Sequence, residues 1–243
     1  MELSGWGRYP RVDCRLLRPR ALKELQDAVA NGPLIARGLG RAYGDSALNQ
    51  NSTIDMSGFN RMLDFEPQSG VLTTEAGVSL AEIIEVFLPR GWFPSVTPGT
   101  KFVTVGGAIA ADVHGKNHHK DGSFRNCVEW LDVLGADGEI RRCSTTENNE
   151  MFAYTIGGMG LTGIILRAAI RLHQVETAWI RQETRPATNL RQALAAFEAT
   201  NDWTYSVAWI DCLSRGDQLG RSLLQLGEHC LTSAPLGHIE GFS

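Results

Sequence analysis

The sequence predicts an α+β fold with a large first part and a smaller second part. Segments with apolar residues at helical spacing alternate with short apolar segments typical of strands. Ala136-Asp137-Gly138 separates two strand segments and is a hairpin signal, so the sheet is expected to be partly antiparallel. The length of 243 residues, 43% of them apolar, is enough for one or two cores.

Apolar spacing and breaker residues predict the elements of the first half. A helix is expected over residues 20–30, with Leu22, Leu25 and Val29 on one face. A second helix opens with a capping box formed by Ser79 and Glu82. Its apolar face consists of Leu80, Ile83, Ile84 and Phe87. Breakers end the two helices at 31–33 and 89–91, and strands are expected at 34–36 and 71–76.

The middle of the chain is expected to complete one layered α/β body. Residues 128–134 form a strand that returns through the hairpin to a second strand at Ile140. Residues 147–154 are long enough for two helical turns, and residues 164–172 are β-rich and apolar.

The pattern changes near residue 175, where we place a domain boundary. Asn189 is expected to cap a helix that carries Leu190, Leu194 and Phe197. A strand with one aromatic face is then formed by Trp203, Tyr205, Val207 and Trp209. Residues 228–243 show no periodicity and receive no structure. The expected domains are therefore residues 1–175, 176–227 and a tail at 228–243.

Composition excludes several classes of protein. The net charge of −4 gives no basic field for nucleic acid. No apolar run approaches the ~20 residues of a membrane span, and the first residues lack a secretion signal, so a cytoplasmic protein is expected. The five cysteines are scattered and include no Cys-x-x-Cys pair, which favours reduced thiols over disulfides or zinc.

Three glycine clusters lie at predicted strand–helix junctions. They are Gly38-x-Gly40, Gly106-Gly107 and Gly157-Gly158-x-Gly160. Glycine allows backbone N–H groups to converge on an anion, so the clusters together suggest a phosphate-bearing cofactor. The first cluster is neither a Rossmann fingerprint nor a P-loop. Arg37 and Arg41 beside it can neutralise charge or form a solvated rim.

The segment around His114 permits two interpretations. His114 and His118 stand four residues apart with His119 adjacent, a spacing that can seat a metal on a helix. Gly115 weakens such a helix and Lys116 places a cation beside the site. Polar residues in a turn are the simpler interpretation of His118 and His119, and no metal site is predicted.

Five segments carry a resemblance to a known family: residues 36–45, 98–100, 105–109, 114–119 and 160–165. They resemble the vanillyl-alcohol-oxidase superfamily, whose PCMH-type domain binds FAD, and within it the decaprenylphosphoryl-β-D-ribose 2′-oxidase group. The resemblance runs in order from about residue 5 to residue 227. It implies a two-subdomain FAD-binding fold over residues 1–175, followed by part of an α/β cap (substrate) domain over residues 176–227.

The resemblance also implies site residues. His114 and Lys116 are the implied catalytic residues, with His114 also against the flavin. The implied cofactor-binding residues are Ala36, Arg37, Gly38, Leu39, Gly40, Arg41, Ala42, Tyr43, Gly44, Asp45, Ser46, Gly99, Thr104, Val105, Gly106, Gly107, Ala111, Asp112, Val113, His114 and Ile165.

The implied activity is a flavin-dependent oxidation. Members of the group oxidise the 2′-hydroxyl of a lipid-linked ribose to a ketone in arabinan and cell wall biosynthesis, and a partner reductase that uses NAD(P)H completes the epimerisation. Such a substrate is expected to bring a cytoplasmic protein into peripheral contact with the inner face of the membrane. The aromatic strand face is expected either to bind this substrate or simply to pack within the sheet.

Two departures from the family qualify these expectations. Residues 41–43 contain no histidine, so FAD is expected to be held without a covalent bond. Family members continue beyond the point equivalent to residue 227, so we expect a truncated enzyme that turns over slowly or not at all. A sugar-lactone or alditol oxidase, a non-catalytic flavin-binding fragment and a metal-binding protein stay open as alternatives.

Overall fold

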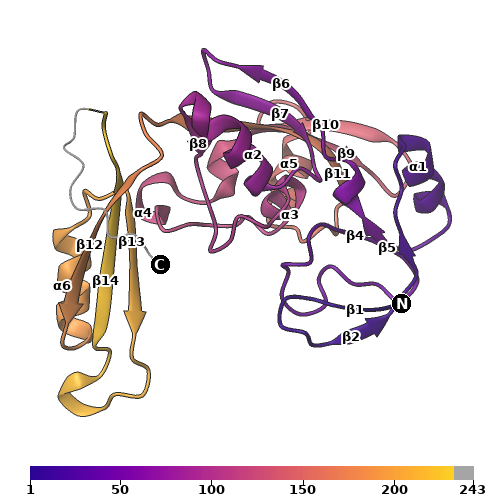
Figure 1. Ribbon diagram of the computed structural model, residues 1–243. Coiled ribbons are helices and arrows are strands. Elements are labelled where there is room, and N and C mark those ends of the chain that lie inside the picture. The colour runs from indigo at the N-terminus through magenta and orange to yellow at the C-terminus, as the bar shows by residue number, and fades with distance from the viewer. Residues whose placement is uncertain (233–243) are drawn as a thin grey trace. The chain divides into compact units, whose positions relative to one another are not determined.

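The computed structural model describes residues 1–232 and divides into two compact units (Figure 1). The first unit comprises Met1–Val86 and Trp92–His173. The second begins with Phe87–Gly91 and continues from Gln174. The division therefore falls two residues before the boundary that the sequence pattern suggests, and a short turn from the first half joins the second unit.

A six-stranded sheet forms the body of the first unit. Its strands run in the order β10, β9, β11, β7 and β6, and β8 also pairs with β11. The registered pairs along this order are antiparallel, which confirms an α+β fold (Figure 1). The strands are β6 (Met62–Glu66), β7 (Val71–Glu75), β8 (Trp92–Pro94), β9 (Val128–Leu134), β10 (Ile140–Ser144) and β11 (Ile164–Gln174).

The predicted hairpin between β9 and β10 is confirmed. Ile140 pairs with Leu134, and Gly138 adopts a φ of +80°, which a glycine tolerates without strain. The Asp137 side chain accepts a hydrogen bond from the Glu139 backbone N–H at 3.1 Å and pairs with Arg141. The contact with Arg141 and the hydrogen bond from the Glu139 N–H together lower the Asp137 pKa to about 2.

Five helices begin in the first unit: α1 (Leu22–Ala30), α2 (Leu80–Phe87), α3 (Val105–Ala110), α4 (His118–Asp121) and α5 (Asn149–Thr155). The capping box of α2 is confirmed, because the Glu82 N–H donates to Ser79 Oγ and the Ser79 N–H donates back to the Glu82 carboxylate. Its apolar face is right as well, since Leu80, Ile83 and Phe87 are buried. The first helix begins at Leu22 rather than Arg20, and Leu22 itself is exposed.

Two smaller sheets accompany the large one. A parallel sheet contains β3 (Leu16–Leu17), β5 (Thr53–Asp55) and β4 (Ile35–Arg37) in that order. An antiparallel pair is formed by β1 (Glu2–Ser4) and β2 (Arg11–Asp13). Sequence reasoning placed only β4 among these five, one residue early, because strands of two or three residues show no periodicity.

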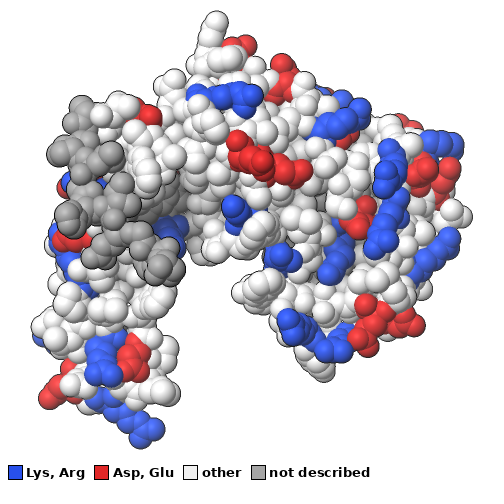
Figure 2. Space-filling model, viewed as in Figure 1, with Lys and Arg blue, Asp and Glu red and all other residues white. Residues whose placement is uncertain are grey.

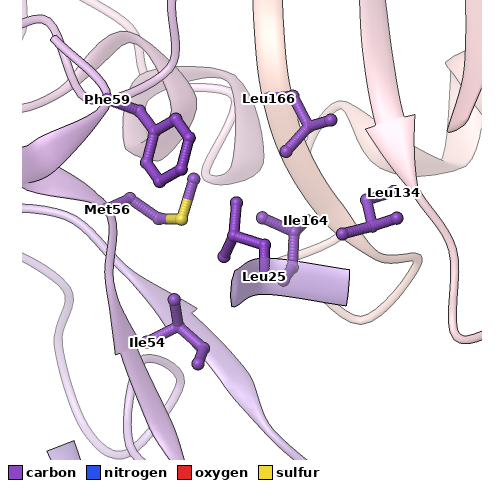
Figure 3. Close-up of a cluster of buried hydrophobic side chains, with 7 residues drawn as sticks. All are labelled: Leu25, Ile54, Met56, Phe59, Leu134, Ile164 and Leu166. Carbon is purple, nitrogen blue, oxygen red and sulfur yellow. The ribbon is translucent and has the colours of Figure 1, made fainter. Parts of the chain in front are cut away.

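One hydrophobic cluster joins the parallel sheet to the large sheet. Figure 3 shows its side chains converging from α1, from β5 and the turn after it, and from β9 and β11. The cluster consists of Leu25, Ile54, Met56, Phe59, Leu134, Ile164 and Leu166. Removing such side chains from water is the main stabilising contribution to a fold, so this cluster fixes the two sheets relative to each other.

The second unit is a three-stranded sheet with one helix. The strands run in the order β12 (Ile180–Ala187), β14 (Ser222–His229) and β13 (Tyr205–Ile210), all antiparallel, and the helix is α6 (Leu190–Ala199). Asn189 caps α6 as predicted, accepting a hydrogen bond from the Gln192 N–H at 3.0 Å.

The predicted helix is therefore confirmed, and it carries Leu190, Leu194 and Phe197, although its buried position is Ala193. Two expectations about this unit are wrong. Trp203 precedes β13 instead of belonging to it. Residues 228 and 229 complete β14, so regular structure does not end before Glu228. The rest of the predicted tail from residue 233 lies outside the described residues.

Surface charge agrees with the composition. Lys and Arg are interspersed with Asp and Glu on the face shown in Figure 2. The five cysteines carry free thiols. Within residues 1–232, no helix has both the length and the apolar character that crossing a membrane requires.

Candidate cofactor-binding site

A cleft in the first unit lies between the end of β4, the start of α3 and the loop before β11. Its wall is built largely from backbone and small side chains. Fourteen of the predicted cofactor-binding residues line it: Ala36, Arg37, Gly38, Leu39, Gly40, Arg41, Ala42, Ser46, Thr104, Gly106, Gly107, Ala111, Val113 and Ile165.

The other predicted residues do not line the cleft. Asp112 accepts a hydrogen bond from the Arg125 backbone N–H at 2.9 Å and pairs with its guanidinium, which makes it a brace. Val105 is fully buried in the core. The remaining ones outside the lining are Tyr43, Gly44, Asp45, Gly99 and His114.

Eight lining residues were not predicted as contacts: Ala47, Met56, Ala76, Val103, Ala110, Met159, Gly160 and Gly163. Gly160 and Gly163 belong to a segment that the sequence already singled out, so a usable signal existed for them. Met56, Ala76 and Val103 are single apolar residues that folding brings to the cleft, and no sequence motif marks them.

The glycine loop presents unpaired backbone donors. Among the described residues, none accepts a hydrogen bond from the backbone N–H groups of residues 38–44. Gly40 has a φ of +70°, a conformation that favours glycine. Successive free N–H groups in such a loop form a concave site for an anion.

Close packing explains why glycine occupies the positions around this loop. A Cβ on Gly38 would lie 2.4 Å from Thr104 Oγ1, so the first glycine cluster lies against the residue that caps α3. A Cβ on Gly106 would lie 2.8 Å from the Ala76 Cβ. The loop is held from outside by the N-terminal segment, where the Trp6 N–H donates to the Ala42 carbonyl at 2.8 Å.

The two arginines of the loop have different roles. Arg37 donates from Nη2 to the Ser4 carbonyl at 2.7 Å and from Nη1 to the Ala47 carbonyl at 3.4 Å, and burial lowers its pKa. It therefore braces the loop. Arg41 donates to the Leu39 carbonyl at 2.7 Å and lies over the Trp6 ring. Its Nε is buried without a partner among the described residues, which leaves a cationic donor for a ligand.

These features fit a dinucleotide with a diphosphate. Free backbone donors and Arg41 suit the phosphate oxygens, and the glycines allow the ligand to approach the backbone. The rest of the wall is mostly apolar and suits a flat ring system.

The histidine segment lies beyond one end of the cleft wall. Val113 lines the cleft, and His114, Lys116, His118 and His119 are exposed. The His114 and His118 rings meet edge to face with their centroids 5.3 Å apart. No group of three or more His, Cys, Asp and Glu side chains gathers to hold a metal anywhere in residues 1–232, so the geometry gives the metal hypothesis no support.

Comparison with known proteins identifies the class. Residues 15–144 match the family model described as FAD binding domain, which is more than half of the chain. The protein is thus a flavoprotein. The chain belongs to the FAD binding domain family, and its cofactor is FAD.

Several curated relatives are oxidoreductases. The chain is 39% identical over 237 residues to decaprenylphosphoryl-beta-D-ribose oxidase of Mycolicibacterium smegmatis, a match covering 93% of this chain and 51% of the relative. It is 30% identical to cytokinin dehydrogenase 5 of Arabidopsis thaliana, over 73% of this chain and 35% of that one. It is 28% identical to L-gulonolactone oxidase of Bos taurus, over 77% and 43%. The chain spans about half the length of the first of these relatives, and less of the others.

Proposed function

We propose that the protein is an FAD-dependent oxidoreductase that oxidises the 2′-hydroxyl of a lipid-linked ribose to a ketone. Support comes from the 39% identity to the mycobacterial decaprenylphosphoryl-ribose oxidase, which extends over both units. The observation that carries the proposal is local. The chain runs from the cleft wall at Val113 directly into two exposed polar side chains, His114 and Lys116.

Each part of the site has a distinct task in this reaction. The loop at residues 38–44 and Arg41 bind the diphosphate, and Arg37 keeps the loop in shape. Bound FAD supplies the acceptor for the hydride that leaves the alcohol carbon. The hydroxyl proton needs a separate acceptor, and an imidazole exchanges protons near neutral pH, so His114 is the proposed base. Lys116 is proposed to orient the substrate.

We propose further that the cofactor is held without a covalent bond. Tethering requires a nucleophilic side chain beside the flavin, and the loop from Ala36 to Ser46 offers no histidine. Cys14, Cys127 and Cys143 are buried, and burial raises the pKa of the Cys127 thiol to about 12, which keeps that thiol protonated.

A lipid-linked substrate implies a membrane surface, and the second unit offers a suitable face. Residues opposite one another in an antiparallel register share a face. One such face carries no Asp, Glu, Lys or Arg: Ile180, Gln182, Thr184, Pro186, Tyr205, Val207, Trp209, Leu223, Gln225, Gly227 and His229. Trp209 is 67% exposed, Ile180 46% and Leu223 45%. We propose that this uncharged face rests on the membrane while the protein remains on the cytoplasmic side.

The product also implies a partner. A ketone formed at the 2′ carbon must be reduced again to complete an epimerisation, so we propose a reductase that uses NAD(P)H as the next enzyme. The sequence and the described residues mark no particular surface for it.

A single-turnover experiment tests the proposed activity. The FAD-loaded protein is mixed anaerobically with a polyprenylphosphoryl ribose or with L-gulonolactone, and loss of the oxidised flavin absorbance is followed. Slow bleaching is expected with the lipid-linked ribose and none with the lactone, and His114→Ala should slow it further. Bleaching by the lactone alone would instead favour the sugar-lactone oxidase alternative, to which the bovine relative points.

A further inference from the structure

We propose that Asn117 is a positioning residue that fixes His114 and Lys116 relative to the cleft. The inference rests on the proposed function for the roles of those two side chains. Asn117 belongs to neither the cleft wall nor the predicted site, and its own side chain is only 1% exposed. It therefore acts on the reaction only through the segment that it holds.

The Asn117 amide makes a bridge between two segments. Its Nδ2 donates to the Ser95 carbonyl at 2.7 Å and to Asp121 Oδ2 at 2.6 Å. Both acceptors require an NH2 group, so the orientation of the amide is unambiguous. Its Oδ1 is buried with no partner among the described residues. A buried, unpaired acceptor destabilises a fold. The two hydrogen bonds that the NH2 group donates therefore account for the presence of an asparagine at this position.

The bridge leads to the large sheet. Ser95 directly follows β8, and its Oγ donates to the Arg171 carbonyl of β11 at 2.8 Å. Asp121 ends α4, so the Asn117 side chain joins the end of this short helix to the residue that follows β8. The segment cannot shift along the sheet without breaking these bonds.

Gly115 shows how closely the backbone is seated between the two proposed catalytic side chains. A Cβ at this position would lie 2.5 Å from the Thr97 carbonyl oxygen and 2.8 Å from Asn117 Oδ1. The other end of the segment is closed by a bridge between His114 and Ser123 and by the Phe124 N–H, which donates to the Val113 carbonyl at 2.8 Å. The backbone is thus fixed at three places, while His114 and Lys116 project from it exposed.

A charge-swap series tests the bridge. Asn117→Asp has the same shape but sets a carboxylate against the Asp121 carboxylate and the Ser95 carbonyl, so both contacts become repulsive. Asp121→Asn is the matched control, because its Oδ1 can still accept from Asn117. The double variant restores one bond, since the new amide at position 121 can donate to the new carboxylate.

The first readout needs no substrate. In NMR spectra of the FAD-loaded chain, the His114 ring resonances should move in Asn117→Asp, stay in Asp121→Asn and return toward wild type in the double variant. The edge-to-face contact with His118 makes these resonances sensitive to a small displacement. Unchanged His114 resonances in a folded Asn117→Asp protein would overturn the proposal. Should that variant not fold, Asp121→Ala removes one acceptor without adding charge, and an unmoved His114 there would overturn it as well.

The second readout separates positioning from folding. Flavin reduction by the lipid-linked ribose should fall about 10- to 100-fold in Asn117→Asp, the loss typical of a misplaced catalytic group, while the dissociation constant for FAD stays unchanged. The double variant should recover part of the rate. A parallel loss of FAD affinity would contradict a positioning role. If the wild-type flavin is not reduced at all, the proposed activity fails, and the NMR series still decides the role of Asn117.

Discussion

Replacing Gly40 by alanine should weaken FAD binding more than the same change at Gly44. Both residues lie in the glycine loop and both have a left-handed backbone, with φ of +70° and +61°. An L-residue in that conformation costs about 1–2 kcal/mol, so the two variants share this contribution. They differ in what the new methyl group meets.

The difference follows from Arg37. A Cβ on Gly40 would lie 2.4 Å from Arg37 Nη2, whereas a Cβ on Gly44 meets no atom within 4 Å. The guanidinium must therefore move, and it loses its 2.7 Å hydrogen bond to the Ser4 carbonyl. A hydrogen bond from a charged donor contributes about 1.5–3 kcal/mol. If FAD requires the braced loop, this energy corresponds to an additional weakening of about 10- to 150-fold.

Titration of the apoprotein with FAD, followed by quenching of flavin fluorescence, measures both dissociation constants. Thermal unfolding of the apoprotein shows whether each variant is folded at the temperature of the titration. Equal dissociation constants for Gly40→Ala and Gly44→Ala would show that the contact with Arg37 has no effect on cofactor binding.

Three further predictions concern the cofactor and the membrane. Arg41→Gln should weaken FAD binding by about 10-fold or more with little change in melting temperature, because Arg41 supplies a charged donor to the ligand. Arg37→Gln should also lower the melting temperature, because Arg37 holds the loop in place. If Arg41→Gln lowered the melting temperature and Arg37→Gln did not, the two roles would be reversed. Acid or heat should release intact FAD into the supernatant, and flavin that remains with the precipitated protein would show a covalent bond. Trp209→Ser should reduce retention on neutral liposomes by about 10-fold, as expected for loss of one large apolar contact. Trp179 precedes β12 and is 52% exposed, and Trp179→Ser should leave the retention unchanged. Equal effects of these two changes would argue against the uncharged face.

The elements that could be predicted are those whose sequence signals lie within a few neighbouring residues. The capping box at Ser79 and the hairpin at Asp137-Gly138 each lie within a few residues, and the structure has both. The parallel sheet was missed because its strands contribute two or three residues each and are stabilised by α1 and the shared cluster. β12 was missed for another reason, since most of its residues are polar and exposed and it gives no apolar alternation.

The site divides in the same way. The glycine loop can be recognised from the sequence, because ordering several glycines in a short stretch costs conformational entropy that a functional role would explain. Met56 and Val103 reach the cleft only through the fold, and neither has a motif around it. Asn117 looks like an ordinary turn residue in the sequence, because asparagine is common in turns. Its burial and its bond to Ser95, 22 residues away, are tertiary facts that no spacing could indicate.

We propose that the cleft between β4 and α3 holds FAD. Titration of the apoprotein with FAD in a calorimeter tests this proposal, with Gly40→Ala and Gly44→Ala measured beside the wild type. We predict one FAD per chain, visible absorbance bands of oxidised flavin in the complex, and a weaker complex for Gly40→Ala than for Gly44→Ala. Absence of binding to the folded wild-type chain, or binding that neither glycine variant alters, would contradict it.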